Sequence, residues 1–226
     1  MTAFQYKMFA AVAMASCLRA QNPLLALPGN YRLVTENETV RVIHVRYGEH
    51  QKLPVHSHSE YPTVYIYLTD SGPVRFSHVE KHAFAIVRPP AMAGTFRVSP
   101  GRLETHEVEN LGAIPTEFLR VEMKQIPLGF QRSSFRGVKP FDLTKSGVSR
   151  EFSSPAFRIE RVVSAGGRGL EIGDSQSPSL VVALSPSVIG PNIHLKPGEV
   201  FWMITRHNTV TGVGGSPAHL LRLLFP

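Results

Sequence analysis

The segment GEHQKLPVHSH (residues 48–58) decides the fold that we expect for this chain. It ends in His56-Ser57-His58 and is soon followed by the apolar run TVYIYL (residues 63–68). Successive side chains of a β-strand point to opposite faces, so both histidines of a His-x-His strand lie on the same face. Two neutral imidazoles on one face are the beginning of a metal site.

The composition favours many short strands over long helices. The 226 residues include 18 Gly and 18 Pro, both of which interrupt helices, and the length allows one large or two small domains. The net charge is +7, but Lys and Arg are scattered, with no run of five. This pattern is typical of a mildly basic solvated surface, and we expect no nucleic-acid partner.

The first twenty residues have the pattern of a secretory signal. Lys7 precedes a short apolar run over residues 8–15, and Ala20 is a plausible cleavage point. The run is too short to cross a bilayer, so we expect a secreted or periplasmic protein without an integral membrane span. An amphipathic N-terminal helix is the alternative. A minor alternative is a lipoprotein in which Cys17, the only cysteine of the chain, is retained and lipidated.

Turn residues divide the rest of the chain into short segments that alternate or are rich in β-branched residues. The pattern predicts strands over residues 40–47, 63–69, 74–79, 83–87 and 117–124. No long helical period is present. Residues 127–150 are rich in Ser, Gly, Lys and Arg, and we expect them to form a linker.

The apolar framework of the first half returns in the second half. Without a gap, an offset of 117 residues pairs Arg41-Val42 with Arg158-Ile159, Leu53 with Leu170, and Val64-Tyr65 with Val181-Val182. Near the end, an offset of 102 pairs Arg120 with Arg222. Two copies of one β unit explain this order.

The second copy lacks the histidines of the first. At these offsets His56 is replaced by Gly173, His58 by Ser175 and His106 by Asn208. The apolar framework persists without them, so we expect the chemistry in the first copy and a structural role for the second.

These residues together resemble the cupin superfamily. Its first motif, G-x5-H-x-H-x3-4-E-x6-G, matches Gly48, His56, His58 and Gly72, with two extra residues before the histidines. Its second motif matches HEVENLG (residues 106–112). The resemblance implies two antiparallel jelly-roll barrels (double-stranded β-helices), an internal metal and frequent homodimers. It divides the chain into a metal-binding domain (30–126), the linker, and a degenerate domain without ligands (151–226).

We expect one divalent metal ion (Fe, Zn or Mn) on His56, His58 and His106. The glutamate of the motif should fall near Pro62 or Thr63, neither of which is a good ligand. Glu60 has the same strand parity as His56 and His58 and is a tentative fourth ligand. Three neutral imidazoles leave the charge of the ion uncancelled, which lowers the pKa of bound water and favours anionic ligands. Histidines satisfied within a core are the alternative.

Other candidates have structural interpretations. His78 and His82 are expected to be solvated in a hairpin. Tyr65 and Tyr67 are ordinary packing residues of a strand. Arg120 could bind a carboxylate, but its counterpart Arg222 persists in the copy without histidines, which favours a structural role.

The function expected from these features is a metalloenzyme that acts on a small oxygen-containing substrate, by dioxygenase-like chemistry or as a metal-assisted lyase or isomerase. The pattern does not identify catalytic residues beyond the metal ligands. One alternative is a non-catalytic protein that binds a small ligand or the metal itself. Another is a structural protein whose histidines are incidental.

Overall fold

The computed structural model describes residues 21–80, 82–137, 141–173, 177–204 and 207–226. The predicted signal sequence, including Cys17, lies outside these residues. The only helix described is the short α1 (Pro23–Ala26), which begins with a proline and is capped by the Asn22 side chain. None of the described helices has the length and apolar character needed to cross a membrane.

Strands β1 to β10 form two antiparallel sheets, which we call the first barrel. One sheet has the order β1-β2-β9-β4-β7-β10 and the other β3-β8-β5-β6. The bounds of the strands are β1 Tyr31–Glu36, β2 Val40–Tyr47, β3 Lys52–His58, β4 Thr63–Tyr67, β5 Val74–His78, β6 Phe84–Arg88, β7 Phe96–Ser99, β8 Glu104–Asn110, β9 Thr116–Met123 and β10 Phe135–Gly137.

Strands β11 to β19 form a second such pair, the second barrel, with the sheets β11-β12-β19-β14-β17 and β13-β18-β15-β16. The prediction of an all-β chain with two antiparallel jelly-roll barrels is confirmed. The bounds are β11 Gly147–Ser153, β12 Arg158–Ser164, β13 Leu170–Gly173, β14 Ser179–Ala183, β15 Ser187–Ile189, β16 Ile193–Leu195, β17 Val200–Met203, β18 His207–Gly212 and β19 Ala218–Leu224.

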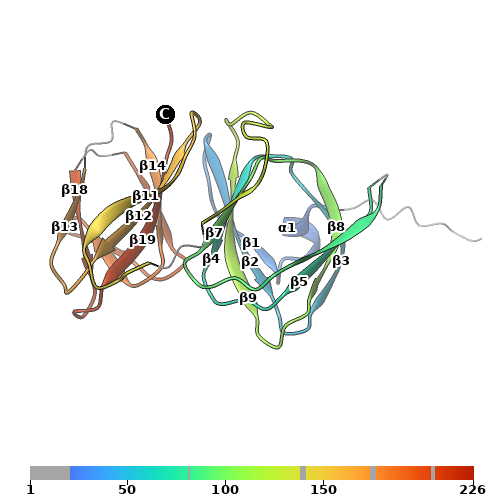
Figure 1. Ribbon diagram of the computed structural model, residues 1–226, viewed down its shortest axis with the longest axis horizontal. Coiled ribbons are helices and arrows are strands. Elements are labelled where there is room, and N and C mark those ends of the chain that lie inside the picture. Colours follow the sequence, from blue (N-terminus) through green and yellow to red (C-terminus); the bar gives the residue numbers. More distant parts are fainter. Residues whose placement is uncertain (1–20, 81, 138–140, 174–176, 205–206) are drawn as a thin grey trace, which may run out of the picture.

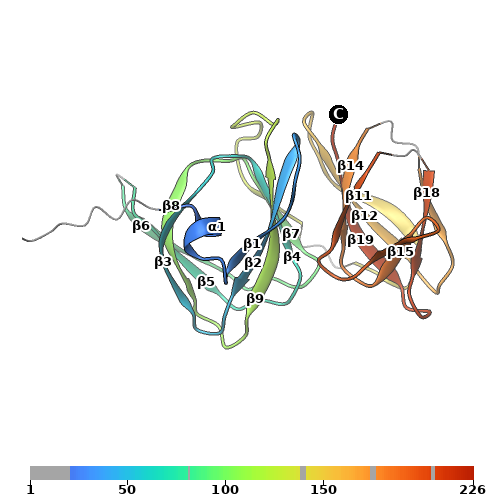
Figure 2. The ribbon, with the colours of Figure 1, turned by 180° about the vertical axis from the view of Figure 1, so that it is seen from behind.

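The larger sheets of the two barrels face each other in the middle of the molecule (Figures 1 and 2). A buried apolar cluster between them includes Leu119 and Val121 of β9 and Leu221 and Leu223 of β19. Each barrel also has its own internal cluster. A central strand such as β9 is therefore buried on both faces, which is why its Phe118 face is not exposed to solvent.

The stretch predicted as a linker is not free of secondary structure. Strand β10 lies within residues 127–150 and extends the large sheet of the first barrel by pairing with β7. Strand β11 begins in the same stretch, at Gly147, and pairs with β12 of the second barrel. The residues of these strands are mostly exposed, so they lack the alternation by which strands are recognised in a sequence. The domain boundaries themselves stay a prediction.

The glycines and the asparagine of the two motifs hold the end of the first barrel together. The Asn110 side chain donates hydrogen bonds to the carbonyl oxygens of Gly48 and Ile114, each at 2.8 Å, and accepts one from the amide of Gly112. Gly72 packs against Gly112 so closely that a Cβ on Gly72 would lie 2.6 Å from the Gly112 Cα. These motif residues therefore serve the fold rather than the metal.

The repeat is real, but one part of its alignment is wrong. Leu53 pairs with Val108 in the first barrel, and Leu170 pairs with Val210 in the second, as the offsets predict. A register shift then adds one residue to β3 between Leu53 and His56. In the second barrel the residue opposite Asn208 is consequently Ile172, not Gly173.

The same shift persists into β4, where Val64 corresponds to Leu180 and not to Val181. Val64 and Leu180 both belong to the cluster between the barrels, whereas Val181 faces the interior of the second barrel. A gap at the bulge was needed, because a slip of one residue moves each side chain of a strand to the opposite face.

Candidate metal centre

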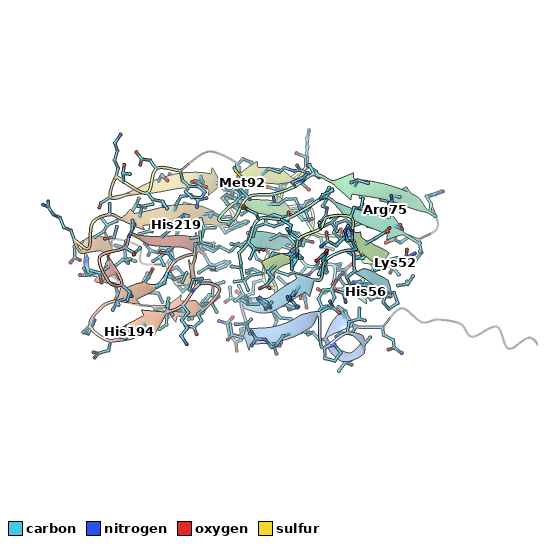
Figure 3. The ribbon with its side chains drawn as sticks, turned by 90° about the horizontal axis from the view of Figure 1, so that it is seen from below. Lys52, His56, Arg75, Met92, His194 and His219 are labelled. Carbon is cyan, nitrogen blue, oxygen red and sulfur yellow. The ribbon has the colours of Figure 1, made fainter. Side chains whose placement is uncertain are left out.

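Three buried histidines converge inside the first barrel. His56 and His58 lie on β3, and the register places His56 directly opposite His106 of the neighbouring β8. Residues opposite one another on paired strands share a face, so the three rings point into the barrel together. One ring nitrogen from each lies within 4.8 Å of the others, and all three side chains are buried. Figure 3 places His56 in the first barrel.

The tautomer of His56 is fixed by its surroundings. Its Nδ1 lies 2.8 Å from the carbonyl oxygen of Pro54, to which only a protonated nitrogen can donate. The lone pair of Nε2 therefore faces the cavity, where it accepts a hydrogen bond from the Tyr31 hydroxyl at 2.8 Å. Metal-binding histidines commonly donate their other N–H to a backbone carbonyl in this way.

His106 is the most unusual of the three rings. Both of its nitrogens are buried and have no hydrogen-bond partner among the described residues. Burial lowers its pKa to about 2, although the carboxylate of Glu104 opposes that shift. A buried imidazole with free lone pairs costs free energy unless something binds to it, and a metal ion is the partner that fits such a nitrogen.

The other two histidines are also held neutral. Burial, and then the charge of Arg120, lowers the pKa of His58 well below its usual value. Burial also lowers the pKa of His56, while its hydrogen bond to Pro54 raises it. Metal binding requires deprotonated imidazole nitrogens, so the cavity presents these rings in the form that binds a cation.

A carboxylate and a guanidinium that were not predicted as site residues border the histidines. Glu104 lies opposite His58 in the register of β3 and β8 and is 5% exposed. Burial alone would raise its pKa, but Arg120 and Arg88 lower it to about 2. Arg120 Nη1 lies 3.8 Å from Glu104 Oε2, and its Nε donates to Glu122 at 2.8 Å. The two-residue spacing between Glu104 and His106 was the sequence signal that could have identified this carboxylate.

Glu60, the tentative fourth ligand, is not brought to the histidines. Strand β3 ends at His58, so the alternation that would have turned Glu60 inward does not continue. Its side chain is exposed, and it is not a member of the cluster of possible metal ligands.

The expectation that His78 is solvated is wrong. It lies on the inward face of β5, directly opposite His106, and is 3% exposed. Its ring stacks on Phe84 with centroids 4.4 Å apart, and its Nε2 accepts from Arg102 at 3.3 Å. The polar residues around it in the sequence suggested a solvated hairpin, but alternation along β5 places His78 inside. His82 is exposed, as expected.

Tyrosines close the cavity on the side of the large sheet. Tyr31 follows α1 and stacks edge-on against His56, with its hydroxyl also 3.1 Å from that of Tyr47. The Tyr65 hydroxyl accepts a hydrogen bond from Arg120 at 3.0 Å. The cavity left among these side chains has a volume of only about 10 Å³, close to the minimum for one water molecule. Sequence analysis missed Tyr31 because its strand shows no clear alternation.

No family model matches the chain, and no curated protein matches it in sequence. Solved structures do resemble it: AerE from Microcystis aeruginosa (TM-score 0.60, 12% identity, covering 87% of this chain and 97% of that one) and the bacterial pirin YhhW from Escherichia coli in complex with nickel(II) (0.60, 11%, 84% and 83%). Oxalate decarboxylase OxdC from Bacillus subtilis also resembles it (0.57, 12%, 84% and 69%). The chain has a cupin fold.

The donor set of this cupin fits a divalent transition metal. Imidazole nitrogen suits zinc, iron, copper and nickel, so the three histidines do not choose among these ions. The nickel(II) bound by pirin YhhW shows that one protein of similar fold holds such an ion. At these low identities the likeness establishes the fold and not the metal or the reaction.

Proposed function

We propose that this protein is a bicupin that binds one divalent metal ion through His56, His58 and His106, in the first barrel alone. The observation that carries the proposal is the His106 ring, which is buried and neutral and has no partner for either nitrogen. The fixed tautomer of His56 supports it, because the free nitrogen of that ring faces the other two.

We further propose that the metal acts on a small oxygen-containing substrate. A bound divalent ion supplies Lewis acidity, and iron would add redox chemistry. Around it, Tyr31 can donate a hydrogen bond into the cavity, and the Glu104 carboxylate stands beside His106 as an acceptor of protons. Arg120, held by Glu122 and Tyr65, adds a fixed positive charge that favours an anionic substrate.

A non-catalytic metal-binding protein is the second candidate, and the size of the cavity favours it. A space of about 10 Å³ holds the ion and little else unless a side chain such as Tyr31 moves. The same closure would suit a protein that holds a metal without turning over a substrate.

Elemental analysis of protein purified from its native host tests the proposal. We expect about one metal ion per chain in the wild type and none in His56→Ala. The matched control is His194→Ala, which replaces an exposed histidine of the second barrel (Figure 3). Absence of metal under every loading condition, or its retention in His56→Ala, would overturn the proposal.

The predicted export is part of the same proposal. The N-terminal pattern supports secretion or a periplasmic location. N-terminal sequencing of the purified protein would give Gln21 as the first residue if the chain is cleaved after Ala20. A start at Cys17 would indicate lipidation instead, and an intact Met1 would overturn the assignment.

A further inference from the structure

A second pocket lies beside the histidine cavity and is positively charged. It has a volume of about 200 Å³, and its lining includes Arg88 at the end of β6, Arg97 of β7 and Arg136 of β10. Its lining residues include no Asp or Glu. The volume is below the roughly 300–1,000 Å³ of sites for drug-sized ligands, so it suits a small molecule.

Arg97 is the residue that points to a ligand. Its side chain is 8% exposed, and its Nε and Nη2 have no hydrogen-bond partner among the described residues. Its guanidinium carbon lies 4.0 Å from the ring centroid of Tyr65, a cation–π contact that leaves these N–H donors unsatisfied. A buried guanidinium without acceptors is costly, and an anion is the group that satisfies it best.

The other two arginines make the imbalance larger. Arg136 stands directly opposite Arg97 in the pairing of β10 with β7, and like charges in that arrangement repel. Burial, and then the charge of Arg97, lowers the pKa of Arg88. Among the described residues, none of the three has a carboxylate within ion-pair distance; the carboxylate whose charge they influence is Glu104 in the histidine cavity.

The pocket adjoins the histidine cavity through Arg88. Arg88 lines both spaces, and its guanidinium carbon lies 4.1 Å from the ring centroid of Phe76. The opposite wall of the pocket is apolar and includes Phe96 and Met92; Figure 3 shows Met92 near the middle of the molecule. A ligand that suits both walls has an anionic group and a short apolar portion.

We infer that this pocket binds the carboxylate of a small organic acid, anchored by Arg97 and Arg136, with Arg88 between the acid and the histidine cavity. Guanidinium groups match a carboxylate with paired hydrogen bonds, and the apolar wall disfavours inorganic phosphate. Binding of the acid does not depend on the metal. Its identity as the substrate of the metal site rests on the proposed function.

Calorimetric titration of chelator-treated protein with succinate tests the pocket. We expect succinate to bind the wild type and Arg132→Gln, and its affinity to fall at least tenfold in Arg136→Gln and in Arg97→Met. Arg132 is an exposed arginine of the same segment that does not line the pocket, so its variant matches the loss of one charge. Thermal unfolding without succinate should occur at a higher temperature in Arg97→Met, because an unpaired buried charge is removed.

Two further arms separate the outcomes. Chloride at the same ionic strength measures general screening of the basic surface, and inorganic phosphate tests the chemical class. Equal effects of succinate and chloride, tighter binding of phosphate, or equal losses in all three arginine variants would each overturn the inference. Intact succinate binding in a His56→Ala protein that holds no metal would support the pocket on its own, whereas metal bound by a wild type that ignores succinate would overturn only the pocket.

Discussion

The two barrels share one framework and differ in what they place inside it. Val42 opposite Val121 in the first barrel corresponds to Ile159 opposite Leu223 in the second. The interior of the first barrel nevertheless carries the histidines with Glu104 and Arg120, whereas the interior of the second is a continuous apolar cluster. A jelly roll of this kind therefore does not need buried histidines to fold, and their presence in one copy calls for another explanation.

The second barrel does more than repeat the first. Arg161 of β12 donates a hydrogen bond of 2.9 Å to the carbonyl oxygen of Gly94, which precedes Thr95 of the arginine pocket. The same guanidinium is paired with Glu151 and lies 2.6 Å from His219 Nε2. The apolar barrel thus supports a loop of the barrel that carries the polar site.

The largest expected effect breaks the correspondence between Arg120 and Arg222. Arg120→Met should lower the free energy of unfolding by about 3–5 kcal/mol, because it leaves the carboxylates of Glu122 and Glu104 buried without their partner. Arg222→Met should cost about 1 kcal/mol, since Glu160 is 3.8 Å away and less buried. Urea unfolding of the two variants measures the difference. Equal losses would show that both arginines serve only the common framework.

The second prediction compares the corresponding positions 106 and 208. His106→Ala should weaken metal binding by at least about 100-fold, because it removes a ligand. Asn208→Ala should leave the affinity unchanged, since Asn208 lies in the other barrel. Competition titration with a chromophoric chelator measures both, and a loss of affinity in Asn208→Ala would contradict the assignment of the metal to one barrel.

A third comparison uses glycines at corresponding positions near the ends of the barrels. Gly112→Ala should cost about 2–3 kcal/mol, because its Cβ would lie 2.7 Å from the Gly72 Cα. Gly214→Ala should cost about 1 kcal/mol, since a Cβ there meets open space and only the positive φ of 63° is unfavourable. Thermal unfolding distinguishes them. A larger loss for Gly214→Ala would show that the close approach of Gly72 and Gly112 is not a constraint.

The smallest expected effect concerns pH and a histidine of the second barrel. Burial, and then Arg161, lowers the pKa of His219 to about 3. Its contribution to stability is complete above the unfolded pKa near 6.5 and is lost as the pH falls from there toward 3, because only the unfolded chain takes up the proton.

His219→Gln should therefore flatten the dependence of the unfolding free energy on pH by up to about 1.4 kcal/mol per pH unit below 6.5. The exposed His194, replaced by Gln, is the control and should leave the slope unchanged. Urea unfolding at pH 7 and pH 5 measures the slopes. An equal slope in wild type and His219→Gln would contradict the burial of a neutral ring.

The sequence was sufficient for the fold and for three of the site residues, and physical reasons explain what it missed. Alternation and the paired motifs identified the barrels and placed His56, His58 and His106 together. The bulge before His56 was invisible, because Val and Ile occur on both faces of buried strands and a gapless alignment still matched them. Glu104, Tyr31 and His78 come from segments whose local pattern looks polar or irregular, and only the register of the sheets brings them to the cavity.

The central claim is that one ion occupies the first barrel and none occupies the second. X-ray diffraction from crystals of the native protein, measured on both sides of the absorption edge of the metal found by elemental analysis, tests it most directly. The account predicts a single anomalous peak about 2.0–2.3 Å from a ring nitrogen of each of His56, His58 and His106. A peak beside Asn208, or a metal-loaded crystal without a peak among the three histidines, would contradict it.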